Sequence, residues 1–113
     1  MFLKNIKLAL ITGALALVPS ITQAEHFTVT QTNKTFMMKG VKVEKLTIKA
    51  GDTISFLNED PWFHNIFSLS ELKTFDLGSY PKGQSKSVTF EKPGQADIEC
   101  AIHPGMLLKL EVK

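Results

Sequence analysis

The sequence predicts an all-β fold, specifically a small Greek-key antiparallel β-sandwich. Three observations lead to this prediction. About seven short segments alternate apolar and polar residues or are rich in β-branched residues, and turn signals separate them at regular spacing. No long stretch shows the apolar period of about 3.6 residues that is typical of a helix. Many short strands with evenly spaced turns favour two packed sheets in one domain.

The first half of the expected domain contains three candidate strands. Residues 27–31 alternate with period two, and residues 43–48 alternate in the same way before Ala50-Gly51-Asp52. Residues 53–57 form another run with high β propensity. We therefore expect a hairpin between the second and third strands, with Gly51-Asp52 as its turn.

Four more strands are expected in the second half. They are residues 64–67, 84–90, 97–100 and 107–112, and Lys92-Pro93-Gly94 predicts a turn between the middle two. The segment from Ser68 to Gly83 fits this pattern least well. Residues 70–72 are typical of the start of a helical turn, and residues 75–83 indicate an ordered loop. Nothing in the sequence suggests a repeat or a second domain.

Residues 1–24 have the pattern of a cleaved export signal. Lys4 and Lys7 precede an apolar run from Leu8 to Val18, and small residues suited to a signal peptidase end at Ala24. A membrane anchor is the less favoured alternative, because the run is shorter than the ~20 apolar residues that a bilayer span needs. We expect a signal peptide at 1–24, a mature domain at 25–113 without a membrane span, and a periplasmic location.

The charge of the mature domain is balanced. The 13 basic residues of the chain are all lysines, and 11 acidic residues stand against them. Removal of the leader takes away Lys4 and Lys7, so the mature domain carries equal numbers of both signs. A neutral domain without a lysine cluster gives no reason to expect binding to nucleic acid.

A metal site is indicated near the C-terminus. Cys100, His103 and Met106 follow one another at intervals of three residues, and His64 can supply a second imidazole. Thiolate and imidazole ligands select copper or zinc, and a thioether favours copper. Structural zinc stays open, although methionine is a poor zinc ligand. A buried, inert Cys100 is disfavoured by its neighbours; as the single cysteine it cannot form an internal disulfide.

Four motifs together resemble the cupredoxins, the small type 1 blue copper proteins. They are Gly51-Asp-Thr-Ile-Ser-Phe-Leu-Asn58, His64-Asn65-Ile66-Phe67, Lys92-Pro93-Gly94 and Cys100-x-x-His103-x-x-Met106. The compact spacing of the last motif is similar to that of the amicyanin-like subgroup of the plastocyanin/azurin superfamily. The resemblance implies one copper ion that cycles between Cu(I) and Cu(II), with His64, Cys100 and His103 as equatorial ligands and Met106 as the weak axial ligand.

The resemblance also implies roles for residues beside the ligands. The backbone amide of Asn65 is expected to donate to the Cys100 sulfur, and Asn65 to tie the ligand loops together. His103 is expected near the surface, within an apolar patch through which electrons pass. Trp62 and Phe63 either belong to this patch or fill the core.

Other polar and sulfur-containing residues are expected to be structural. Glu59 and Asp60 could steer a partner or bind a second cation, but we expect them to be solvated, as most surface acids are. Met37 and Met38 are expected in the core or in an edge strand, and His26 on a surface strand. Tyr80 and Asp76 have no chemical role that the sequence indicates.

The sequence favours an exported one-electron carrier over an enzyme. A multicopper oxidase or nitrite reductase needs a second copper centre rich in imidazole, and the chain contains only His26, His64 and His103. A Cys-His protease would need an oxyanion hole that no motif marks. The expected partners are a donor dehydrogenase or membrane complex and an acceptor oxidase or reductase, and we expect a monomer. The alternative is periplasmic copper storage, delivery or resistance.

Overall fold

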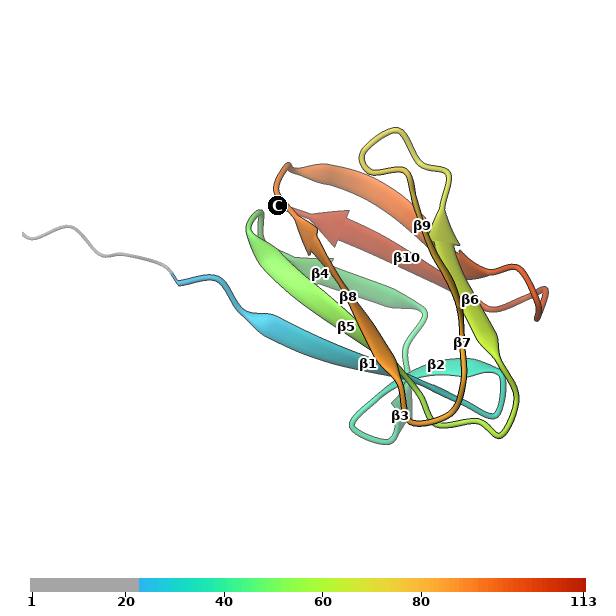
Figure 1. Ribbon diagram of the computed structural model, residues 1–113. Helices are drawn as coiled ribbons and strands as arrows, with labels where there is room; N and C mark the ends of the chain where they lie inside the picture. Colours follow the sequence, from blue (N-terminus) through green and yellow to red (C-terminus); the bar gives the residue numbers. More distant parts are fainter. Residues whose placement is uncertain (1–22) are drawn as a thin grey trace, which may run out of the picture.

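The computed structural model describes residues 23–113, so the predicted signal peptide lies almost entirely outside the described residues. Ten strands form two sheets that pack face to face (Figure 1). None of residues 23–113 is helical, and this range accordingly holds no helix long and apolar enough to cross a membrane. The prediction of an all-β sandwich is confirmed.

Each sheet has five strands. One sheet contains, in spatial order, β3 (Val41–Lys42), β2 (Thr35–Met38), β1 (His26–Thr32), β5 (Asp52–Asn58) and β8 (Ser85–Phe90). The other contains β4 (Lys45–Ile48), β10 (Leu107–Val112), β9 (Gly94–Cys100), β6 (His64–Ser68) and β7 (Phe75–Tyr80). The strands predicted from the sequence correspond to β1, β4, β5, β6, β8, β9 and β10.

The sheets are mixed, although most neighbours are antiparallel. β1 runs parallel to β5, and β4 runs parallel to β10. The predicted hairpin at Gly51-Asp52 is wrong, because β4 and β5 lie in different sheets. The turn is present, and Asp52 accepts the Lys49 amide at 2.8 Å, but it carries the chain from one sheet to the other. Local turn chemistry predicts a change of direction and does not determine which strands pair.

The segment from Ser68 to Gly83 differs from its prediction. Residues 75–80 form β7, an edge strand that pairs with β6, and residues 71–72 form a turn without a helix. The alternation of β7 is weak because only Tyr80 is buried in it. Ser70 Oγ accepts the amide of Asp97 at 2.8 Å, which ties the loop to β9.

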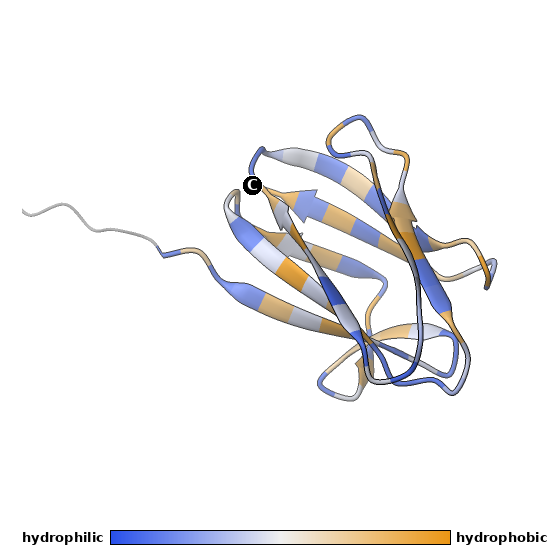
Figure 2. Ribbon diagram, in the orientation of Figure 1, coloured by the Kyte–Doolittle hydropathy of each residue, from blue (hydrophilic) through white to orange (hydrophobic). Residues whose placement is uncertain are grey.

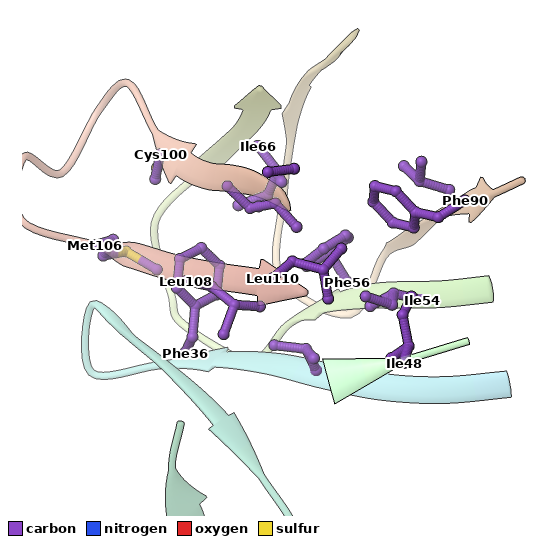
Figure 3. Packing of buried hydrophobic residues seen from close by; sticks show 14 of the residues in the cluster. Phe36, Ile48, Ile54, Phe56, Ile66, Phe90, Cys100, Met106, Leu108 and Leu110 are labelled. Carbon is purple, nitrogen blue, oxygen red and sulfur yellow. The ribbon is translucent and has the colours of Figure 1, made fainter. Parts of the chain in front are cut away.

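Apolar side chains alternate along the strands and meet between the sheets. In β10, Leu108, Leu110 and Val112 are buried, whereas the residues between them are exposed. Figure 2 shows this alternation as bands of colour along the strands. Figure 3 shows the core, with Cys100 and Met106 together at one end of it. That end is where the candidate ligands lie.

The residues expected to be structural have such roles. The buried Tyr80 hydroxyl donates to Gln31 Oε1 at 2.8 Å and joins the two sheets through the core. Its burial, and then the nearby Cys100, raise the pKa of Tyr80. Asp76 Oδ1 accepts the Gly78 amide at 2.8 Å. His26 is exposed on β1, where its Nε2 contacts Ser55 Oγ at 2.5 Å.

The methionine pair lies on the short strand β2. Met38 packs against the core from a half-buried position, and Phe36 beside the pair is fully part of the core. The expectation of a core position is therefore confirmed for Phe36 and Met38, whereas Met37 is half-buried on a strand that lies between β3 and β1.

Candidate metal centre

Two adjacent strands and one loop bring the candidate ligands together. His64 begins β6 and Cys100 ends β9, and these strands pair with Ile66 opposite Cys100. His64 lies two residues before Ile66, so it points to the same face of the sheet as Cys100. The loop from residue 101 to 106 then connects β9 to β10 and carries His103 and Met106.

Three donor atoms form a compact triangle. His64 Nδ1 lies 3.5 Å from Cys100 Sγ, Cys100 Sγ lies 3.8 Å from His103 Nδ1, and the two Nδ1 atoms are 3.2 Å apart. The point equidistant from corners with these separations is about 2.0 Å from each, which is close to a zinc–nitrogen bond of ~2.0–2.1 Å and shorter than a zinc–sulfur bond of ~2.3 Å. His64, Cys100 and His103 also form a group that can hold a metal ion.

The chemistry of the donor set fits copper. A thiolate with two imidazole nitrogens suits copper or zinc and disfavours hard cations such as Mg²⁺ or Ca²⁺. His64 is fully buried, Cys100 is 4 % exposed, and His103 is half-buried. Met106 is also buried, and its amide donates to the His103 carbonyl at 3.2 Å. The thioether therefore belongs to the same end of the core as the triangle.

Asn65 links the strand of His64 to the strand of Cys100 through its backbone. Its amide donates to Cys100 Sγ at 3.4 Å, and its carbonyl accepts the Ala101 amide at 3.2 Å. The side-chain Oδ1 of Asn65 is buried and has no hydrogen-bond partner. The main chain of Asn65 thus links the strand of His64 to Cys100 and to the start of the loop that follows it.

Asp60 is the site residue that the sequence interpretation placed wrongly. It is 2 % exposed, and its Oδ2 lies 2.7 Å from His64 Nε2. The carboxylate also accepts the amides of Asn33 at 2.6 Å and Lys34 at 2.9 Å. Glu59, by contrast, is exposed as expected and accepts the Thr32 hydroxyl. The prediction of a solvated carboxylate is therefore wrong for Asp60.

The ionisation of Asp60 determines which nitrogen of His64 is free. Burial alone would raise the pKa of Asp60, but hydrogen bonds from the Lys34 amide, the His64 ring and the Asn33 amide lower it overall. An ionised carboxylate only accepts hydrogen bonds, so His64 Nε2 must donate. In the neutral ring the lone pair is then on Nδ1, the atom that faces Cys100.

His103 lies in a different environment from His64. Partial burial, and then the neighbouring His64 and Lys34 side chains, hold the pKa of His103 below its ordinary value. The ring centres of His103 and Trp62 are 6.1 Å apart, and Lys34 Nζ lies 5.1 Å from the centre of the Trp62 ring. At neutral pH the His103 imidazole is uncharged and able to bind a metal.

Exposed apolar residues lie next to the candidate ligands, Trp62 beside the His103 ring and Phe63 and Ile102 directly before His64 and His103 in the sequence. Trp62 is 38 % exposed and Phe63, directly before His64, is 51 % exposed. Ile102, directly before His103, is 46 % exposed. The alternative that Trp62 and Phe63 fill the core is wrong, and we call these three side chains the apolar rim.

Comparison with known proteins finds a family of copper-binding proteins and several similar solved structures. Residues 23–113 match the model of a family described as copper binding proteins, plastocyanin/azurin family. Amicyanin from Paracoccus versutus (Thiobacillus versutus) is 27% identical with a TM-score of 0.67, over 87% of this chain and 87% of that chain. No curated protein sequence matches.

Two amicyanin variants have similar structures. A proline-to-glycine variant in its reduced Cu(I) form at pH 4 is 25% identical with a TM-score of 0.67, over 87% of this chain and 88% of that chain. A reduced tryptophan-to-tyrosine variant is 23% identical with a TM-score of 0.68, over 83% and 87% of the two chains. The second likeness supports the fold alone.

Proposed function

Because the chain belongs to the plastocyanin/azurin family of copper-binding proteins, we propose that it is a type 1 copper protein that carries single electrons between redox partners. The observation that supports this most is the triangle of His64 Nδ1, Cys100 Sγ and His103 Nδ1. Copper, when bound, supplies the one-electron change between Cu(I) and Cu(II).

In this proposal His64, Cys100 and His103 are the equatorial ligands, and Met106 is the weak axial ligand. Two imidazoles and a thiolate with a distant thioether suit neither oxidation state of copper fully. His64 and Cys100 are buried and held by the pairing of β6 with β9, so these two donors would move little when the charge of the metal changes. The amide of Asn65 donates to the Cys100 sulfur, which withdraws charge from the thiolate and tunes the reduction potential.

Electron exchange would take place at His103. This half-buried side chain has Ile102 and Trp62 as exposed apolar neighbours. Small apolar patches suit short-lived contacts, because they release water readily and bury too little area for a permanent complex. We infer redox protein partners that cover this rim, a donor dehydrogenase or membrane complex and an acceptor oxidase or reductase.

The biological setting follows from the leader and the single centre. We propose a signal peptide at 1–24, a periplasmic mature domain at 25–113 that is monomeric, and no catalytic reaction of its own. The chain has three histidines, and two of them belong to this centre, so only His26 would be left for a second copper centre. Copper storage or delivery is the competing function, since it would use the same ligands.

The experiment that tests the proposal has two parts. Optical and paramagnetic-resonance spectra of the Cu(II) protein should show the intense thiolate-to-copper transition, and Cys100→Ser should abolish it. The electron self-exchange rate should then be fast. Slow self-exchange combined with ready release of copper to an acceptor protein would favour storage or delivery, and an ordinary colourless adduct would contradict the type 1 site.

A further inference from the structure

The carboxylate of Asp60 joins two parts of the molecule that are distant in sequence. Its Oδ1 accepts the Asn33 amide, and its Oδ2 accepts the Lys34 amide and contacts the His64 ring. Residues 33–34 form the turn between β1 and β2, and both have a left-handed backbone, with φ of 53° and 58°. This conformation aims two consecutive amides at one carboxylate.

We propose that Asp60 and the β1–β2 turn form one positioning unit for copper, which holds His64 with its proton on Nε2 and its Nδ1 lone pair towards the metal. This inference rests on the proposed function, because it concerns the same metal centre. Asp60 does not contact the donor triangle itself. It acts through His64, so it is a positioning residue.

Burial makes the unit rigid. Asp60 and His64 are both removed from solvent, and a buried polar group is stable only with its hydrogen bonds in place, which here include a backbone amide on each carboxyl oxygen. The amide of Asp60 is held in turn by Asn58 Oδ1 at 2.8 Å. The side chain of Asn58 also donates to the Trp62 and Tyr80 carbonyls, at 2.8 and 3.0 Å. The loop that precedes His64 is thereby fixed at both ends.

The same turn reaches the exposed side of the centre. Lys34 gives its amide to Asp60, while its ammonium group lies over the Trp62 ring, a favourable cation–π arrangement. Trp62 is adjacent to the ring of His103. One turn therefore contacts both Asp60, which is the partner of the buried His64, and Trp62, which is the aromatic neighbour of the half-buried His103. A change in the turn should be detected at the metal, although no turn residue is a ligand.

Asp60→Asn tests the link to His64. The asparagine side chain offers one oxygen to three donors, the Asn33 amide, the Lys34 amide and His64 Nε2, so at least one of these hydrogen bonds is lost. In the metal-free protein, ¹⁵N NMR should show His64 protonated on Nε2 in the wild type, and a smaller fraction of this tautomer in Asp60→Asn, because a neutral amide oxygen attracts the Nε2 proton less than a carboxylate does. Cu(I) affinity, measured by competition with a chromophoric chelator, should fall roughly 10- to 100-fold.

The matched control is Asp76→Asn, which removes one exposed carboxylate that also accepts a backbone amide. It should change neither the protonation of His64 nor the Cu(I) affinity. The inference is overturned if the wild-type His64 carries its proton on Nδ1, or if Asp60→Asn keeps wild-type Cu(I) affinity in a folded protein.

Two variants of Asn33 test the turn itself. Asn33→Gly accepts the left-handed backbone, whereas Asn33→Val opposes it because a β-branched side chain is strained there. Asn33→Val should lower the Cu(I) affinity and shift the thiolate-to-copper absorption, and Asn33→Gly should not. Equal effects of the two variants on the folded protein would overturn the role of the turn.

The outcomes for the inference and for the proposed function are separable. If the wild-type protein lacks the thiolate-to-copper transition, the proposed function fails, and the NMR measurement on the metal-free protein still decides how Asp60 holds His64. If the transition is present but neither Asp60→Asn nor Asn33→Val alters copper binding, the proposed function stands and the positioning unit is rejected.

Discussion

Replacement of His64 by alanine should both open the metal centre and destabilise the metal-free protein. His64 is fully buried, and its Nε2 is 2.7 Å from the carboxylate of Asp60, which is itself 2 % exposed. Leaving a buried acceptor without its donor typically costs ~1–3 kcal/mol, and more when the acceptor is charged. Asp60 keeps its two amide hydrogen bonds from the β1–β2 turn, so we expect a loss of about 3 kcal/mol of unfolding free energy.

The assay combines urea unfolding of the metal-free protein with optical spectra of the copper form. A loss of about 3 kcal/mol would lower the melting temperature of a domain of this size by roughly 12–24 °C. Exogenous imidazole should enter the space left by the side chain and restore the thiolate-to-copper absorption. His26→Ala, which changes an exposed strand residue, should alter stability by less than about 0.5 kcal/mol.

Two results would refute this reasoning. A loss below about 1 kcal/mol would mean that Asp60 does not depend on His64, since a buried carboxylate without its donor costs more than that. A normal copper spectrum of His64→Ala without imidazole would mean that another group supplies the equatorial nitrogen, with His26 as the remaining candidate.

Three further predictions concern the ligands and the acid stability. Cys100→Ser should abolish the intense colour of the Cu(II) form, and colour that survives would disprove thiolate ligation. Met106→Leu should keep the colour and raise the reduction potential measured by voltammetry, because a weak donor to Cu(II) is lost; a lower potential would contradict an axial role. The amides of Glu25 and Lys49 hold the pKa of Asp52 below its ordinary value. Asp52 therefore stabilises the protein above the unfolded-state pKa of about 4, and this stability is lost as the pH falls through the lower folded-state value. Asp52→Asn should lower the urea concentration at the unfolding midpoint at pH 7, and this midpoint should then decrease less between pH 7 and pH 3 than it does in the wild type. A decrease equal to that of the wild type would disprove the assignment.

The strands that the sequence reveals are those with one buried and one exposed face. β10 and β8 alternate regularly because each covers the core with every second residue. β7 escapes prediction because it is a half-exposed edge strand, with Gly78 in left-handed conformation and a bulge in the partner strand. The parallel pairing of β1 with β5 also leaves no local signal, since it depends on which strands meet after the chain crosses between sheets.

The residues of the metal centre also differ in how well the sequence predicts them. Cys100, His103 and Met106 come from one short loop, and their spacing is visible in the sequence. His64 is distant, and it is identified because the thiolate needs further nitrogen ligands and few histidines are present. Asp60 is misplaced because its environment is made by the amides of residues 33–34, which carry no side-chain signature. A buried carboxylate that is neutralised by backbone donors cannot be distinguished from a solvated one by residue type.

The two histidines present the same atom to the centre but have opposite surroundings. His64 is buried, and Asp60 fixes its second nitrogen; His103 is half-buried and lies beside the exposed ring of Trp62. In the proposed function, ligand geometry would therefore depend mainly on the His64 side and contact with a partner on the His103 side. The β1–β2 turn contacts both sides through Lys34, whose backbone amide donates to Asp60 and whose ammonium group lies over the Trp62 ring.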